Sequence, residues 1–306
     1  MKKMISIAFF TLASLSIFAF LFFTIRQMLV SREIELEWNT APTVIPPLQT
    51  TSRLEIIPLY EEARISEEFI SGHGVSYLIR TDSATILLDL GNNPDQLAIA
   101  PYAQNMRTLG IDWEEIDRIV ISHPHPDHVG GTEAWRQNTI NFGELPGGVG
   151  DRLVFIPTKM NYAGAAHATI PTLPGPAVGT TGVISYPEVF PLSLFEPKGS
   201  EQALVINVYG QGLVLVTGCG HPGLEKLVTR AESLYGQTVI GVVGGLHYGD
   251  ATAEQVEPHI RFLQSRQPKL VALSPHDSGP LALEAFQSAF GNSYHTLRTG
   301  EVIQFP

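Results

Sequence analysis

The chain has 306 residues, of which 44% are hydrophobic and 16% charged, so a large core is feasible and disorder of the whole chain is excluded. The formal net charge of -11 repels phosphate backbones and disfavours a nucleic-acid substrate. The single cysteine, Cys219, excludes an internal disulfide. This length predicts one large α/β domain plus an appendage.

The appendage lies at the start of the chain. Residues 5–25 contain no charged side chain, and at about 1.5 Å per residue such a helix is roughly 30 Å long, the thickness of a bilayer's hydrocarbon core. We expect residues 1–30 to form an uncleaved signal anchor, with a cleaved signal peptide or a buried core helix as alternatives. Lys2 and Lys3 favour a single-pass membrane protein whose N-terminus is cytoplasmic and whose remaining chain is extracytoplasmic.

A linker and a strand hairpin follow the anchor. Residues 31–53 contain three prolines among Thr and Gln, a composition that predicts a semi-extended linker. The globular domain is therefore expected to cover residues 54–306. Its first elements are two β-branched runs, residues 74–81 and 84–90, which predict a hairpin.

A helix and a compact strand are expected next. Residues 93–110 predict a helix, with Pro94 in its first turn and Gly110 at its C-terminal cap. Residues 118–122 form a short apolar run and predict a strand.

The second half of the chain alternates apolar strands with amphipathic helices. Together with the strand-rich first half, this pattern predicts a layered α/β fold with mixed sheets. The expected strands are residues 202–209, 213–217, 238–243 and 269–274, and the expected helices are residues 224–235, 253–265 and 281–290.

Residues 143–182 interrupt this pattern because they are rich in Gly and Pro. Such a composition cannot sustain long helices or central strands, so it predicts a loop. The loop is either a lid that faces a substrate or an insertion at the surface.

The strongest chemical signal follows the strand at residues 118–122. The segment reads His-Pro-His-Pro-Asp-His, with metal-ligand side chains at His123, His125, Asp127 and His128. Residues two apart in an extended segment point the same way, so His123 and His125 can hold one metal, while Asp127 and His128 turn toward a second. Imidazole and carboxylate ligands suit zinc, iron or manganese.

This motif resembles that of the metallo-β-lactamase superfamily, and the resemblance extends over residues 54–306. The wider motif set is typical of the branch of dihydropterin-methyl-ribofuranosyl-aminobenzene-phosphate synthase-like proteins. The matching segments are residues 72–76 (H-G-x-S), 87–91 (an early D-x-G turn), 201–204 (D-E-x-x-L), 213–223 (T-G-C-x-H-x-G), 244–247 (G-G-F-H) and 274–279 (P-x-H-x-x-G).

The resemblance implies a four-layer αββα sandwich with two divalent metal ions at one edge. The metals are expected to be zinc, with iron or manganese as alternatives. The resemblance assigns His123 and His125 to the first metal, Asp127, His128 and His276 to the second, and Asp89 to support of the metal loop.

Two positions depart from the superfamily pattern. Glu201 stands where a third histidine for the first metal is usual, and Cys219 replaces the usual bridging aspartate. We therefore assign His221, two residues after Cys219, as the remaining ligand. Cys219 is either a thiolate ligand or a small buried residue, and Glu201 either a ligand or a supporting carboxylate.

The other histidines divide into two groups. His247 and His73 lie in matching motifs, so each either faces the site or forms a hydrogen bond in the core. His167, His259 and His295 have no motif around them and are interpreted as ordinary residues.

These assignments predict a hydrolase that uses a metal-bridging hydroxide on a small-molecule ester, phosphoester or lactone. Asp127 would orient the nucleophile, and a metal would stabilise the oxyanion. A pterin-related synthase activity like that of the branch is the first alternative. A non-catalytic metal-binding module for redox chemistry or sensing is the second.

Overall fold

The computed structural model describes residues 2–40, 45–162, 165–167, 171–189, 192–194 and 196–305, with side chains from Ser14 onward except at 165–167. It divides into two compact units. The smaller comprises Met1–Ala41 and Ser185–Gly199, and the larger comprises Pro42–Ile184 and Ser200–Pro306.

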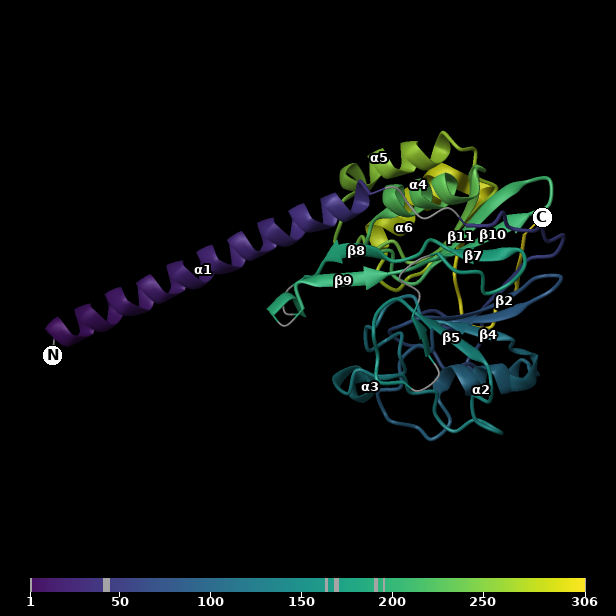
Figure 1. Cartoon of the computed structure of the whole chain (residues 1–306), viewed down its shortest axis with the longest axis horizontal. Helices are drawn as coiled ribbons and strands as arrows, with labels where there is room; N and C mark the ends of the chain where they lie inside the picture. The colour runs from purple at the N-terminus through teal and green to yellow at the C-terminus, as the bar shows by residue number, and fades with distance from the viewer. Residues whose placement is uncertain are drawn as a thin grey trace. The chain divides into compact units, whose positions relative to one another are not determined.

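The larger unit contains two mixed sheets (Figure 1). Among the described residues, the first sheet has seven strands in the order β15-β1-β2-β3-β4-β5-β6, and the second has six in the order β14-β13-β12-β11-β10-β7. The first comprises β1 (Glu55–Tyr60), β2 (Ser76–Arg80), β3 (Thr85–Leu88), β4 (Arg118–Val120), β5 (Leu153–Ile156), β6 (Ala165–His167) and β15 (Ile303–Gln304). The second comprises β7 (Val178–Thr180), β10 (Leu204–Val208), β11 (Gly212–Thr217), β12 (Val239–Gly244), β13 (Leu270–Leu273) and β14 (Tyr294–Thr296).

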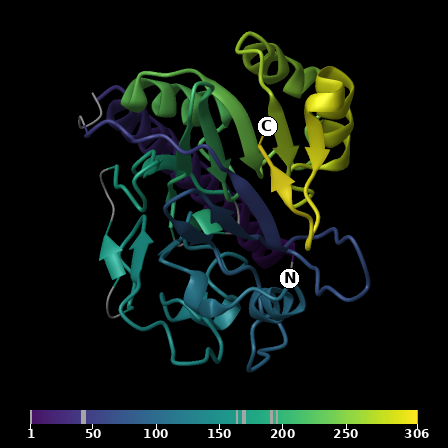
Figure 2. The same cartoon turned by 90° about the vertical axis from the view of Figure 1, so that its right-hand side faces the viewer.

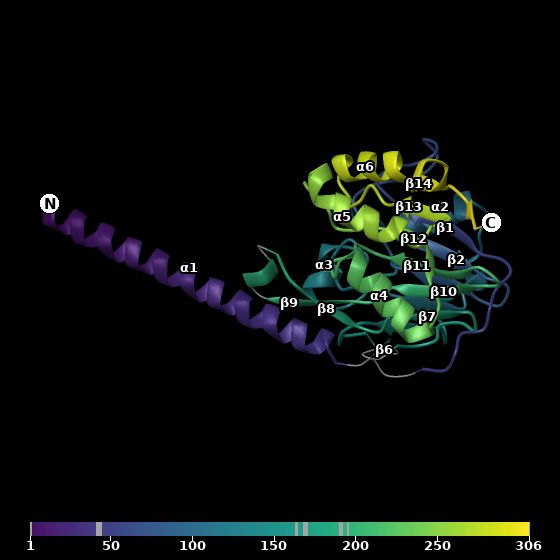
Figure 3. The same ribbon diagram turned by 90° about the horizontal axis from the view of Figure 1, so that it is seen from above.

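Helices cover the outer faces of both sheets, as the views in Figures 2 and 3 show. Helices α2 (Pro101–Thr108) and α3 (Thr132–Arg136) lie outside the first sheet. Helices α4 (Leu224–Tyr235), α5 (Ala253–Gln264) and α6 (Pro280–Phe290) lie outside the second. The predicted four-layer α/β arrangement with mixed sheets is therefore confirmed.

Strand alternation builds the core on both faces of the first sheet. Tyr77 and Ile79 of β2 point between the two sheets, whereas Leu78 packs beneath the outer helices. The same alternation separates Ile86 from Leu87 in β3, because neighbouring side chains of a strand face opposite ways. The predicted hairpin is confirmed, since β2 and β3 pair antiparallel.

The predicted helix over residues 93–110 is shorter than expected, because α2 begins only at Pro101. Asn93 instead closes a turn: its Oδ1 accepts from the Leu97 amide at 2.9 Å and its Nδ2 donates to the Leu97 carbonyl at 2.8 Å. The proline in the first turn of α2 is therefore Pro101 and not Pro94, and proline is common at this position. The predicted end is right, since Gly110 follows the helix with φ +69°.

The prediction of a loop over residues 143–182 is wrong in part. The segment contains β5, β6 and β7, and β5 pairs parallel with β4 beside the His-Pro-His-Pro-Asp-His motif. Strands of three or four residues fit between turn-forming Gly and Pro, so composition alone cannot exclude them. The part of this loop at 163–164 and 168–170 lies outside the described residues.

The smaller unit combines a long helix with a hairpin arm. Helix α1 (Lys2–Trp38) continues past the predicted boundary at residue 30, because residues 31–38 contain neither Gly nor Pro. By length and composition, Ser14–Trp38 can cross a membrane. The arm consists of β8 (Ile184–Pro187), η2 (Leu192–Leu194) and β9 (Lys198–Glu201), with β8 and β9 paired.

Candidate metal centre

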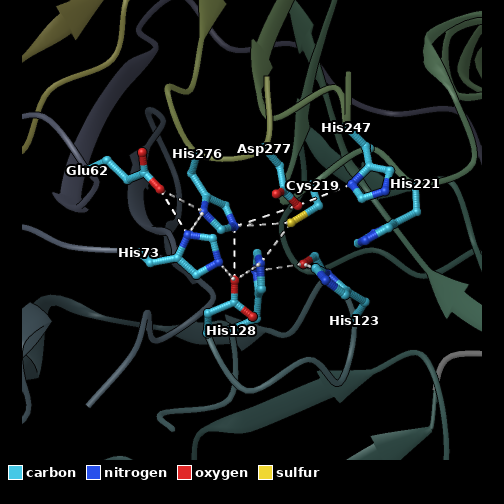
Figure 4. A network of polar contacts seen from close by, with 12 residues as sticks. Glu62, His73, His123, His128, Cys219, His221, His247, His276 and Asp277 are labelled. Carbon is cyan, nitrogen blue, oxygen red and sulfur yellow. Dashed lines mark hydrogen bonds and ion pairs between the residues drawn. The ribbon is translucent and has the colours of Figure 1, made fainter. Parts of the chain in front are cut away.

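The motif residues meet where the parallel strands of both sheets end (Figure 4). Asp89 follows β3 and the His-Pro-His-Pro-Asp-His segment follows β4. Cys219 follows β11, His247 follows β12 and His276 follows β13. Residues distant in sequence thus converge at one edge of the sandwich, where the carboxyl ends of parallel strands commonly form sites.

Asp89 positions His128 directly and His123 through Ser122. Its buried carboxylate accepts from the Ser122 amide and from Ser122 Oγ, both at 2.6 Å, and lies 2.7 Å from His128 Nδ1. Because Ser122 Oγ donates to Asp89, it accepts from His123 Nδ1 at 2.9 Å. Both histidines therefore carry the proton on Nδ1 and turn an Nε2 lone pair into the site, as metal-ligating histidines do.

A first donor group surrounds Cys219 and the last superfamily histidine. His128 Nε2 lies 3.0 Å from Cys219 Sγ, and His276 Nε2 lies 3.4 Å from the same sulfur. Asp127 Oδ2 lies 2.9 Å from His276 Nε2 and 3.7 Å from His128 Nε2. Four possible metal ligands therefore face one another. They are Cys219 and the three residues assigned to the second metal, Asp127, His128 and His276.

A second donor group joins His123, Cys219 and His221, whose ligand atoms all lie within 4.8 Å of one another. The His125 ring lies 4.5 Å from His123 and 4.9 Å from His221, measured between centroids. His123 Nε2 is fully buried and has no hydrogen-bond partner among the described residues. Burial and the neighbouring histidines lower the pKa of His123, so its imidazole is neutral.

Glu201 is turned toward protein donors. Its Oε1 accepts from Thr217 Oγ1 at 2.9 Å and from the Gly220 amide at 2.8 Å. Its Oε2 accepts from the His221 amide at 2.8 Å and lies 3.0 Å from His221 Nδ1. Burial raises the pKa of Glu201, but the contacts with His221 and Gly220 outweigh it and lower that pKa to about 2.

Two histidine–carboxylate pairs lie at the exposed rim. His73 Nδ1 lies 2.9 Å from Glu62 and 3.1 Å from His276 Nδ1, and its Nε2 lies 3.5 Å from Asp127. His247 Nδ1 lies 3.2 Å from Asp277, and its ring lies 4.3 Å from His221. Both histidines of the matching motifs are therefore at the site.

The sequence-based interpretation did not single out Glu62, Asp277 or Ser122. Asp277 and Ser122 directly adjoin His276 and His123, so adjacency could have marked them. No motif marks Glu62. His259, which lies on α5, contacts the Tyr248 hydroxyl, and His295 is exposed on β14, whereas the side chain of His167 lies outside the described residues.

The donor set fits the divalent metals that the fold family implies. His123 Nε2 is a buried lone pair without a partner among the described residues, and a cation would supply one. Imidazoles combined with a thiol and a carboxylate suit zinc or iron better than magnesium or calcium. The residues assigned to the two metals are thus together, with Cys219 between the two donor groups.

Comparisons with known proteins agree with this geometry. Residues 71–141 match the profile of the Metallo-beta-lactamase superfamily. The chain is 27% identical over 292 residues to 7,8-dihydropterin-6-methyl-4-(beta-D-ribofuranosyl)-aminobenzene-5'-phosphate synthase of Methanocaldococcus jannaschii, a match covering 82% of this chain and 97% of the relative.

Solved structures share the fold. One is a metal-dependent hydrolase of the beta-lactamase superfamily, with TM-score 0.60 and 21% identity over 82% of this chain and 99% of that chain. Another is the isothiocyanate hydrolase from Delia radicum gut bacteria, with TM-score 0.52 and 12% identity over the same shares. The chain therefore has the metallo-β-lactamase fold, and its residues 71–141 match the model of that superfamily.

Proposed function

We propose that the chain is a membrane-anchored, metal-dependent hydrolase of a small-molecule ester, phosphoester or lactone. The observation that carries this proposal is the buried Nε2 of His123, which has no hydrogen-bond partner among the described residues and lies in one group of possible metal ligands with Cys219 and His221. A buried imidazole lone pair without a hydrogen-bond partner is costly unless a cation binds there.

The proposed ligands form two sets that share Cys219. The first set contains His123, His125 and His221, and the second contains Asp127, His128 and His276. Two divalent cations bound there would supply Lewis acidity and lower the pKa of a water molecule toward neutrality. Zinc is the metal we expect, with iron or manganese as alternatives.

The chain's own residues would then orient the reaction. Asp127 faces both His128 and His276, so its carboxylate can hold a water molecule at the centre of the site. Burial raises the pKa of Asp127, but the neighbouring His128 and His276 lower it by more. The net lowering of this pKa keeps the carboxylate ionised, so it can accept hydrogen bonds. Asp89 and Glu201 keep the imidazoles in a fixed tautomer.

The full chain in detergent provides the test. Bound metals would be counted by mass spectrometry, and ester, phosphodiester and lactone substrates would be assayed with and without chelator. We expect chelator-sensitive turnover that Asp127→Ala abolishes and the surface change Asp151→Ala leaves intact. Two bound metals without turnover of any class would refute the hydrolase and favour the metal-binding module.

A second candidate function is synthesis of a pterin-related compound. The match to the Methanocaldococcus jannaschii synthase over most of both chains favours it. An extracytoplasmic domain argues against it, because biosynthetic intermediates are cytosolic. An assay of the purified chain for formation of a dihydropterin–aminobenzene conjugate, the product class in the relative's name, would separate the two functions.

Localisation is part of this proposal. Helix α1 would anchor the chain in a membrane by one span, with the metallo-β-lactamase domain outside the cytoplasm. We expect no nucleic-acid substrate, because the net charge is -11.

A further inference from the structure

The hairpin arm of the smaller unit is bound along one side of α1. Near the base of the arm, Lys198 Nζ lies 2.6 Å from Glu33 and 2.7 Å from Glu37, and Ser185 Oγ donates to Glu37 at 2.6 Å. Val30 and Ile34 on the same side of the helix are buried. The arm is therefore attached to the helix by ion pairs and by apolar packing.

Farther from its base, the arm contacts residues nearer the start of α1. Gln27 Nε2 donates to the Glu188 carbonyl at 3.0 Å. Arg26 Nη1 donates to the carbonyls of Ser193 at 3.0 Å and Leu194 at 3.2 Å. The arm thus runs roughly 16 Å down the helix, from Glu37 to Arg26, with its tip toward the N-terminus (Figures 1 and 3).

Arg26 is also the boundary of the charge-free run. No charged residue occurs between Lys3 and Arg26, whereas Arg32, Glu33, Glu35 and Glu37 follow. Helix α1 has 37 residues and is about 55 Å long, so a bilayer core of about 30 Å covers only part of it. A helix that spans with its charge-free run places Arg26 at the bilayer surface, and the tip of the arm with it.

The described part of the tip, Val189 and residues 192–194, is exposed at both ends and uncharged. Its residues 189–195 read Val-Phe-Pro-Leu-Ser-Leu-Phe and include no charged side chain. Val189 is 55% exposed and Leu194 is 37% exposed. Its backbone carbonyls are partly satisfied by Arg26, which lowers the cost of leaving water.

We propose that the tip of the arm, at Val189 and residues 192–194, enters the bilayer interface beside α1 and forms a second membrane contact. The occupant of this apolar surface is lipid, because the tip lies where the charge-free run of α1 ends. The contact would hold the arm and the charged C-terminal end of α1 at the membrane surface. This inference rests on the anchoring proposed above for α1.

Three matched leucine variants of the full chain test the proposal: Leu194→Cys at the tip, Leu36→Cys on the charged end of α1 and Leu15→Cys within the charge-free run. The native Cys219 is only 1% exposed, so it should react little with the fluorophore. Labelling of the wild-type protein measures this background. Each variant carries an environment-sensitive fluorophore and is placed in phospholipid nanodiscs. Quenching is then measured with aqueous iodide and with lipids bearing a nitroxide at a shallow or a deep chain position.

We expect the label at residue 194 to resist iodide several-fold better than the label at residue 36 and to be quenched most by the shallow nitroxide. The label at residue 15 should respond to the deep nitroxide. If residue 194 is as iodide-accessible as residue 36 while residue 15 is buried in lipid, the tip contact is overturned and the anchor stands. If residue 15 is also accessible to iodide, the anchor and the tip contact both fail.

Discussion

Glu201 Oε2 lies 3.0 Å from Nδ1 of His221 and also accepts the His221 amide. The residue at the usual position of a ligating histidine therefore holds a different histidine in place. His221 comes from the end of β11, two residues after Cys219, and reaches the same donor group as His123. The departure at Glu201 and the presence of His221 are two parts of one arrangement.

Glu201→Ala should weaken binding of one metal without abolishing binding of the other. Loss of a carboxylate that orients a ligating histidine typically costs about 10–100-fold in metal affinity. Competition titration with a chromophoric zinc chelator measures this, with the exposed Glu225→Ala as control. Equal loss of both metals would indicate that Glu201 serves the whole site instead of His221.

Cys219→Ser should remove a thiolate ligand. In the cobalt-substituted protein we expect a sulfur-to-cobalt charge-transfer band in the near ultraviolet, absent from the variant. The reason is that Cys219 Sγ lies within 3.4 Å of two imidazole nitrogens, a spacing suited to ligands of one ion. A wild-type spectrum without this band would make Cys219 a packing residue.

Gly218→Ala should disrupt the support of the metal loop. A Cβ at this glycine would lie 2.2 Å from Ser122 Oγ and 2.9 Å from Asp89 Oδ2, so the hydrogen bonds of both side chains must shift. Gly210→Ala is the control for metal content, because no atom lies within 4 Å of its added Cβ and only its φ of +66° strains the new residue. We expect metal loss only at Gly218, together with unfolding about 1–3 kcal/mol easier than wild type in urea.

Chelation should lower the melting temperature of the larger unit. Ligands that bind only the folded state add stability of about 2.7 kcal/mol at a concentration 100 times the Kd. Differential scanning calorimetry with and without chelator would show this shift, and zinc should restore it. In Asp89→Ala, the shift should shrink, since His128 and Ser122 both lose their acceptor. An unchanged melting temperature in the wild type would argue against bound metal.

Local patterns were enough to predict much of the fold. The apolar run after Gly110 and the alternation of strands and helices after residue 200 located β4, β10 to β13 and α4 to α6. The start of α2 was predicted wrongly because both Pro94 and Pro101 fit the first turn of a helix. The hydrogen-bonded turn from Asn93 to Leu97 excludes Pro94, so the helix begins at Pro101. The three short strands within residues 143–182 depend on pairing with strands outside or within the segment: β5 pairs with β4, β6 with β5 and β7 with β10.

The sequence by itself determined the residue types of the site, because His123, His125, Asp127 and His128 fall within six positions after one strand. Only the tertiary structure decided the roles of Glu201, Glu62 and Asp277. Their partners are 20, 11 and 30 residues away along the chain, in His221, His73 and His247. A side chain's protonation and direction depend on such neighbours, and the pairing of β1 with β2, β10 with β11 and β12 with β13 is what brings them together.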